Sequence, residues 1–136
     1  MANFVYKKAK EAILNGQFNF SSNNFKVLLL KNTYSPNENT DQFISDIQSS
    51  DISYRSPEIQ NVTNTLGVID ANDLSLTLPA NTSFDAIVLY QVGINDSNSR
   101  LLFYIEDSDG LPFPGSLEPI TVVFNWNNEV SRILSI

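Results

Sequence analysis

The hydrophobic residues follow a helical period only near the beginning of the chain. In residues 3–14 one helical face collects Phe4, Val5, Lys8, Ala9, Ala12 and Ile13. Apolar residues that recur every three to four positions are typical of an amphipathic helix. We therefore expect one short helix over residues 3–14, with Asn3 as its N-cap and Gly16 as its end.

After this segment the spacing changes to that of strands. Residues 25–32, "FKVLLLKN", form a continuous apolar run of strand length, which predicts a central strand buried on both faces. Residues 73–78 alternate, with leucines on one face and Ser or Thr on the other, which predicts a strand with one solvated face. Residues 85–94 and 100–107 are two apolar runs joined by "NDSNS", which predicts a β-hairpin.

The remaining pieces are shorter. Thr40 or Asp41 is expected to cap one helical turn that places Phe43, Ile44 and Ile47 on the core. Strands are expected near 52–55 and 58–63. A closing pair is expected at 120–127 and 129–136, with a tight turn at Asn127 and Asn128.

About eight strands at short, regular spacing favour a mainly β fold over an α/β fold, whose parallel strands would need helices between them. We therefore predict one domain spanning residues 1–136: an antiparallel β-sandwich or barrel, with a short N-terminal α-helix and strands from about residue 25 to residue 136.

Charge and composition exclude several classes of function. Eight Lys and Arg against 15 Asp and Glu give a net charge of −7, which opposes binding to nucleic acid or to anionic lipid. The absence of Cys and His removes disulfides, the usual zinc sites and every Ser-His or Cys-His catalytic pair. No apolar stretch approaches the roughly 18 residues of a membrane span. We expect a soluble protein with no membrane partner, made in a reducing cytoplasm.

Two acidic segments are candidates for chemistry. "EDSDG" at 106–110 and "VIDANDLS" at 68–75 supply oxygen ligands, but neither completes a calcium-loop pattern. We interpret both as strand connections, because Asp, Asn and Gly favour turns. A carboxylate pair joining Asp70 to Glu106 or Asp107, and a cation near Asp70 or Asp107, both stay open. We expect no catalytic residue, metal or cofactor, and hence no enzyme.

A carbohydrate-binding module is a further alternative. Trp126, the only Trp of the chain, would form an aromatic sugar platform together with Tyr54, Tyr90 and Tyr104. A single Trp in a β-protein is more often a core or interface residue.

The order of several segments resembles that of a family of small virion-associated proteins of tailed bacteriophages. The resemblance covers nearly the whole chain and rests on these segments: "MANFVYKKAKEAILNGQFNF", "FKVLLLKNTYSPN", "TDQFISDI", "DANDLSLT", "AIVLYQVG", "SRLLFYIEDSDGLPFP" and "ITVVFNWNNEVSRILSI". The chain has "PGSLEP" where such proteins often have a Gly-rich turn, and Asn127-Asn128 where they have Asn-Gly.

This resemblance implies a structural protein located in the virion and assembled in the host cytoplasm. It implies a capsid decoration (cement) protein that binds the major capsid protein or other virion proteins and forms a homo-oligomer with isologous or ring-like contacts. A tail, neck or fibre-attachment component is the alternative.

We expect partner contacts in the N-terminal segment and in the loops at 34–42 and 106–116. Phe113, framed by Pro112 and Pro114, is expected to be an exposed aromatic residue in a Pro- and Gly-rich loop, which suits an interface. The expected contact residues are Phe4, Val5, Tyr6, Tyr34, Pro36, Phe113 and Pro114.

Overall fold

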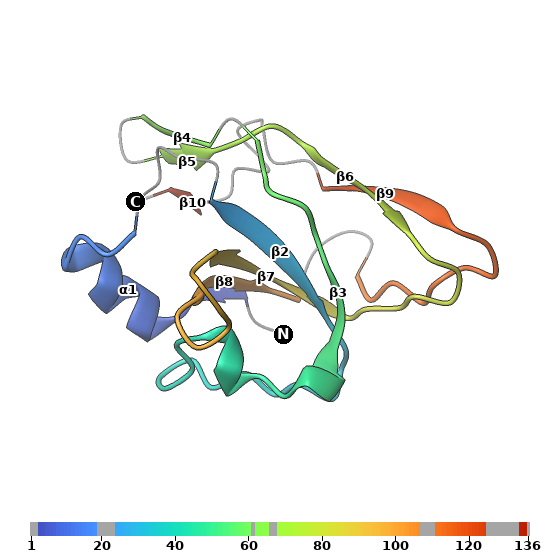
Figure 1. The fold of residues 1–136 in the computed structure, drawn as a ribbon, viewed down its shortest axis with the longest axis horizontal. Helices are drawn as coiled ribbons and strands as arrows, with labels where there is room; N and C mark the ends of the chain where they lie inside the picture. The colour runs from blue at the N-terminus through green and yellow to red at the C-terminus, as the bar shows by residue number, and fades with distance from the viewer. Residues whose placement is uncertain are drawn as a thin grey trace.

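The fold is mainly antiparallel β with one short α-helix, which confirms the predicted fold class (Figure 1). A computed structural model describes residues 3–18, 24–60, 62–65, 68–106, 111–124 and 134–135. Within these ranges, ten strands form sheets of five, three and two strands. The five-stranded sheet ends in two unclosed edges, so it is an open sheet and not a barrel.

The five-stranded sheet is the centre of the molecule. Its spatial order is β1 (Asn3–Val5), β8 (Arg100–Ile105), β7 (Ala86–Gln91), β2 (Phe25–Leu30) and β3 (Ile52–Arg55). Every neighbouring pair is antiparallel. β2 lies between β7 and β3, and all of its residues except Lys26 are buried. This confirms the central strand that the apolar run predicted. The hairpin of β7 and β8 is also confirmed.

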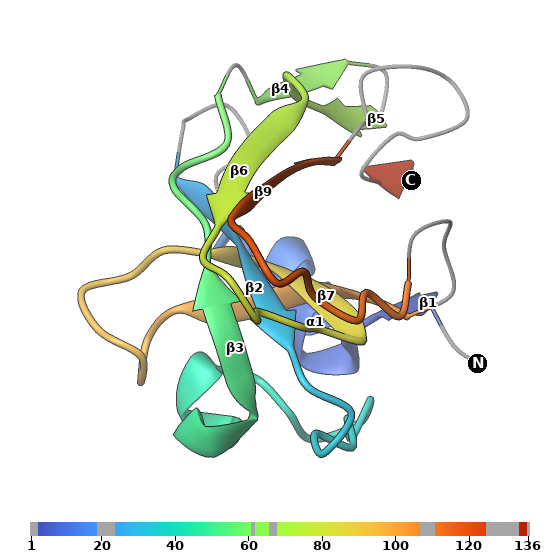
Figure 2. The same cartoon turned by 90° about the vertical axis from the view of Figure 1, so that its right-hand side faces the viewer.

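A second group of strands lies along one side of this sheet (Figures 1 and 2). It contains β4 (Thr63–Thr65), β5 (Val68–Asp70), β6 (Leu74–Leu78), β9 (Ile120–Phe124) and β10 (Leu134–Ser135). The leucines of β6 are buried while Ser75 and Thr77 are exposed, as the alternating pattern predicted. The expected strand at 58–63 is wrong: the described residues 58–60 and 62 lie outside the strands, and β4 begins at Thr63.

The expected pairing of the two last strands is wrong. β9 pairs with β6, and β10 pairs with β5. Both of the last strands therefore pair with the stretch 68–78 and not with each other. In this pairing, apolar residues of β9 lie opposite the buried leucines of β6, and such cross-strand apolar pairs stabilise the two strands. The proposed turn residues Asn127 and Asn128 lie outside the described residues.

The helix α1 spans Lys7–Leu14, not residues 3–14. Residues 3–5 pair with the edge of β8, and backbone pairing there replaces helical hydrogen bonds, so Asn3 is not the N-cap. Ala9 and Ala12 face the core. Gly16 has a φ of 70°, and its N–H donates to the carbonyl of Ile13, which confirms it as the helix end.

The expected helical turn is a 3₁₀ turn, η1 (Ile44–Asp46), followed by η2 (Ser49–Asp51). Ile44 and Ile47 are buried, as predicted, and Phe43 is half-buried. The cap, however, is neither Thr40 nor Asp41. The Asp46 carboxylate accepts the backbone N–H groups of Gln42 and Phe43 at 2.8 and 2.9 Å.

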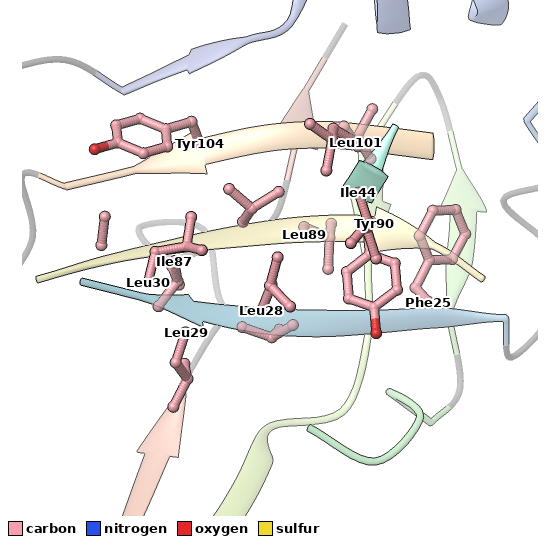
Figure 3. Packing of buried hydrophobic residues seen from close by; sticks show 14 of the residues in the cluster. Phe25, Leu28, Leu29, Leu30, Ile44, Ile87, Leu89, Tyr90, Leu101 and Tyr104 are labelled. Carbon is pink, nitrogen blue, oxygen red and sulfur yellow. The ribbon is translucent and has the colours of Figure 1, made fainter. Parts of the chain in front are cut away.

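The described strands and α1 share a hydrophobic core (Figure 3). Figure 3 shows that β2, β7 and β8 supply most of its labelled side chains, with Ile44 reaching in from η1. Among the described residues, no helix is long and apolar enough to cross a membrane.

Candidate functional site

A cleft of about 240 Å³ opens at one end of the five-stranded sheet. We call it the tyrosine cleft; it is lined by Lys31, Asn32, Tyr34, Asp85, Ala86, Tyr104, Glu106 and Pro112. Besides the tyrosines, the lining contains three ionisable side chains: the ammonium of Lys31 and the carboxylates of Asp85 and Glu106.

Strand direction explains why these residues meet. The register places Leu30 at the end of β2 opposite Ala86 at the start of β7, and Ile87 opposite Ile105 at the end of β8. Because both pairs are antiparallel, the residues that follow β2, precede β7 and follow β8 share one end of the sheet. Lys31, Asp85 and Glu106 are those flanking residues.

Two buried phenols, one of them from the cleft lining, form a hydrogen-bonded chain that ends at a carboxylate. The hydroxyl of Tyr34 donates to Oδ2 of Asp41 at 2.7 Å. A phenol has a single proton to donate, so the hydroxyl of Tyr6, 2.9 Å from that of Tyr34, is the donor between the two. Burial raises the pKa of both phenols, and the neighbouring Asp41 carboxylate adds to the effect.

Tyr104 joins the cleft to the N-terminal strand. Its hydroxyl donates to Oε2 of Glu106 at 3.0 Å, and its ring stacks on Phe4 at a centroid distance of 5.1 Å. The rings of Tyr34 and Tyr104 lie 6.1 Å apart, edge to face. Burial raises the pKa of Tyr104, and the Glu106 carboxylate raises it further.

These groups support binding more readily than proton transfer. With a raised pKa, each phenol stays protonated at neutral pH and donates to a carboxylate or to another phenol, so it is a poor base and nucleophile. The side chains of Lys31, Asp85 and Glu106 place one positive and two negative charges in the cleft lining.

The described residues contain no group of three or more acidic side chains placed to hold a metal ion. Asp107 and Asp109, and the side chain of Asp70, lie outside the described part of the chain. The open question of a cation near Asp70 or Asp107 is therefore not addressed by this geometry.

The structure brings together several residues expected to contact partners. Phe4 and Tyr34 both contact Tyr104, and Phe4 also meets the ring of Tyr6 at 5.2 Å. Tyr6 and Tyr34 are buried, with Tyr6 at 0% exposure, so their rings serve the core of this chain. Val5 is half-buried on β1.

The other expected contact residues lie in loops. Pro36 is half-buried and Pro114 is exposed. The expectation that Phe113 is an exposed aromatic residue is wrong. Its ring is half-buried against Phe84 at 5.2 Å, and its N–H and carbonyl both bond to the backbone of Phe84. Phe113 therefore anchors the loop that brings Pro112 to the cleft.

Sequence reasoning missed Lys31, Asp41 and Asp85. Lys31 and Asp85 do carry a recognisable signal, because each is a charged residue directly beside a long apolar run. Only the strand order shows that these two runs are neighbours. Asp41 was considered as a helix cap, whereas its carboxylate accepts the Tyr34 hydroxyl and the N–H of Asn37.

The aromatic sugar platform finds little support among the described residues. Tyr90 and Tyr104 are both buried, and Tyr54 is half-buried on β3. Sugar platforms need exposed ring faces, which buried rings cannot present. Trp126 lies outside the described residues.

Comparisons of the chain with protein-family models, with curated proteins and with solved structures gave no match.

Proposed function

We propose that this chain is a non-enzymatic structural protein of a bacteriophage virion, a decoration (cement) protein that binds the capsid shell and stabilises it. The observation that carries the proposal is the convergence at the tyrosine cleft. Tyr34 and Pro112 line the cleft and come from the two loops, 34–42 and 106–116, in which partner contacts are expected. Phe4 comes from the third such segment, the N-terminal one, and stacks on Tyr104 of the cleft lining. Segments far apart in sequence that meet at one polar cleft form a natural recognition surface.

The hydrogen bonds of the cleft favour a fixed surface. Tyr34 and Tyr104 are each held by a carboxylate, and Asn3 Oδ1 accepts the N–H of Glu106 at 3.0 Å. Side chains held in one arrangement lose little entropy when a partner binds. A protein that must bind many equivalent positions on a particle benefits from such a preformed surface.

The overall composition is consistent with the same role. The net charge of −7 disfavours direct contact with the packaged nucleic acid, so the proposed partners are the major capsid protein or other virion proteins. The bacteriophage family that the chain resembles is the source of the virion assignment.

The test is a binding experiment with particles that lack this protein. Purified chain is added to such particles, unbound protein is removed by sedimentation, and the particles are imaged. Decoration predicts saturable binding with density repeated over the shell. Density confined to a vertex or to the tail would instead support the neck, tail or fibre-attachment alternative. Failure to bind any part of the particle would contradict a virion role.

A charge reversal tests whether the cleft makes the contact. Lys31→Glu changes an exposed residue of the cleft lining and is expected to weaken particle binding at least about tenfold, because it removes the one ammonium group of the lining and leaves only carboxylates there. Lys10→Glu is the matched control, because Lys10 is an exposed lysine of α1 outside the cleft lining. Equal binding by both variants would place the contact elsewhere on the protein.

A further inference from the structure

Among the described strands, β9 is an edge strand. It pairs with β6 along its full length, from Ile120 opposite Leu78 to Phe124 opposite Leu74, without a register shift. On its other edge no described strand pairs with it (Figure 2). An unpaired edge presents a row of backbone donors and acceptors to any strand that approaches.

β9 lacks the features that usually protect such an edge. Its sequence, "ITVVF", contains no charged residue and no Pro, and its pairing with β6 has no bulge. The edge strand β3 differs, because its pairing with β2 is irregular between Leu29 and Leu30, and because Arg55 forms an ion pair with Asp96 at 2.8 Å. β1, the opposite edge, has three residues.

Apolar side chains are exposed along and beside this edge. Leu117 is 89% exposed, Ile120 37% and Val123 59%. Val123 lies opposite Ser75 and Thr121 opposite Thr77, so these four residues share the solvent-facing side of the ribbon formed by β6 and β9. Apolar residues gathered on an unprotected edge indicate an interaction surface.

The charges of β9 and of the whole chain bear on which partner binds the free edge of β9. Residues 119–128 contain no ionisable side chain, so a strongly charged partner finds nothing to pair with on β9. A second copy carries the same net charge of −7, so two copies repel each other least where they meet through a segment free of acids. β9 is such a segment, and an antiparallel pair of identical strands is self-complementary.

We propose that β9 pairs antiparallel with β9 of a second copy, across a two-fold axis at Val122. In this register Thr121 faces Val123 of the second copy, and Ile120 faces Phe124. The two ribbons then join into one sheet in the order β6, β9, β9, β6. The pairing is argued from the edge itself and stands whether or not the chain binds a particle.

Charge substitutions on β9 test the proposal. The variant Thr121→Lys/Val123→Lys places lysines opposite lysines in the proposed register, and Thr121→Glu/Val123→Glu places acids opposite acids. Each is expected to raise the dimer dissociation constant at least about tenfold, measured by sedimentation velocity. Mixing the two variants is expected to restore a heterodimer, because opposite charges then face each other. Ser75→Lys/Thr77→Lys is the matched control on β6 and should still dimerise.

Three results would overturn the proposal: a wild-type chain that sediments as a monomer, a mixture of the two variants that stays monomeric, or a β6 control that dissociates as much as the β9 variants. Amide hydrogen exchange on the wild-type chain gives an independent measurement. The β9 amides should lose protection on dilution while those of β2 keep it, and equal behaviour of both strands would contradict an edge interface. No particle enters these assays, so they can fail or succeed independently of the proposed virion role.

Discussion

Three buried tyrosines keep their hydroxyl groups in hydrogen bonds to a carboxylate or to another phenol. Tyr34 donates to Asp41 and Tyr104 to Glu106, while Tyr6 bonds to Tyr34. A buried hydroxyl without a partner would cost free energy, so these bonds allow aromatic side chains with polar ends to lie in the core. Among the described residues, no buried side-chain nitrogen or oxygen lacks a hydrogen-bond partner.

The substitution Tyr34→Phe should destabilise the fold by about 1–3 kcal/mol at neutral pH, because it removes the acceptor for Tyr6 and the donor to Asp41. The measurement is urea-induced unfolding. Tyr54→Phe, at a half-buried tyrosine of the edge strand β3, is the control and should change the free energy of unfolding less.

The same tyrosines predict a loss of stability at alkaline pH. The pKa values of Tyr6, Tyr34 and Tyr104 are raised in the fold above the ordinary value of about 10, so the fold favours the protonated phenols. Their contribution is complete below about pH 10 and falls as the pH rises above it. Thermal unfolding followed from neutral to strongly alkaline pH should show this decline, with a shallower slope for Tyr34→Phe. An equal slope in the variant would contradict the assignment.

At the scale of elements, side chains fix the loop between β7 and β8. The hydroxyl of Ser99 accepts the N–H of Gly93 at 2.9 Å and donates to the carbonyl of Asn95 at 2.8 Å. The side chain of Asn98 accepts the N–H of Asn95 at 2.9 Å. These local bonds explain how a loop rich in Asn and Ser holds the hairpin in one register.

Gly93 is the residue of this loop at which a side chain does not fit. A Cβ atom there would lie 2.5 Å from the carbonyl oxygen of Asn98 and would also contact the Asn98 side chain too closely. Gly93→Ala should therefore destabilise the fold by about 1–3 kcal/mol in urea unfolding. Ser97→Ala, at an exposed position of the same loop, should change it by less than about 0.5 kcal/mol. Similar values for both variants would show that the loop adapts freely.

At the scale of the molecule, the N-terminal segment belongs to the core. β1 pairs with β8, Tyr6 is fully buried, and Ala9 and Ala12 of α1 are buried too. The N-terminal segment thus holds the sheet together, and any partner contact it makes comes in addition to this role.

Deleting residues 1–14 should abolish cooperative unfolding, since it uncovers one edge of the sheet and removes the hydrogen-bond partner of Tyr34. Circular dichroism during heating is the measurement. The control Lys8→Ala/Glu11→Ala removes an ion pair of 3.8 Å on α1 and should cost less than about 0.5 kcal/mol. A deleted chain that still unfolds cooperatively would show that the segment is peripheral.

Local patterns were sufficient for much of this fold. The apolar run of β2, the alternation in β6, the hairpin of β7 and β8, and Gly16 at the end of α1 follow from hydrophobic period and turn chemistry, which neighbouring residues determine. The candidate site could be predicted only in part from the sequence. The loops 34–42 and 106–116 were expected to contact partners, whereas Lys31 and Asp85 of the cleft lining were not predicted.

Tertiary structure decided the rest. β1 is a strand because the edge of β8 offers backbone partners, although residues 3–5 continue the helical period. β9 pairs with β6 and not with β10, because this register places its apolar residues opposite the buried leucines of β6. β10 pairs with β5. Strand order then gathers Lys31, Asp85 and Glu106 at one end of the sheet. The sequence by itself determined the strands that carry a long apolar run or a clear alternation, because those patterns depend on neighbouring residues alone. Long-range burial and edge pairing determined the remaining strands and decided which strands are neighbours.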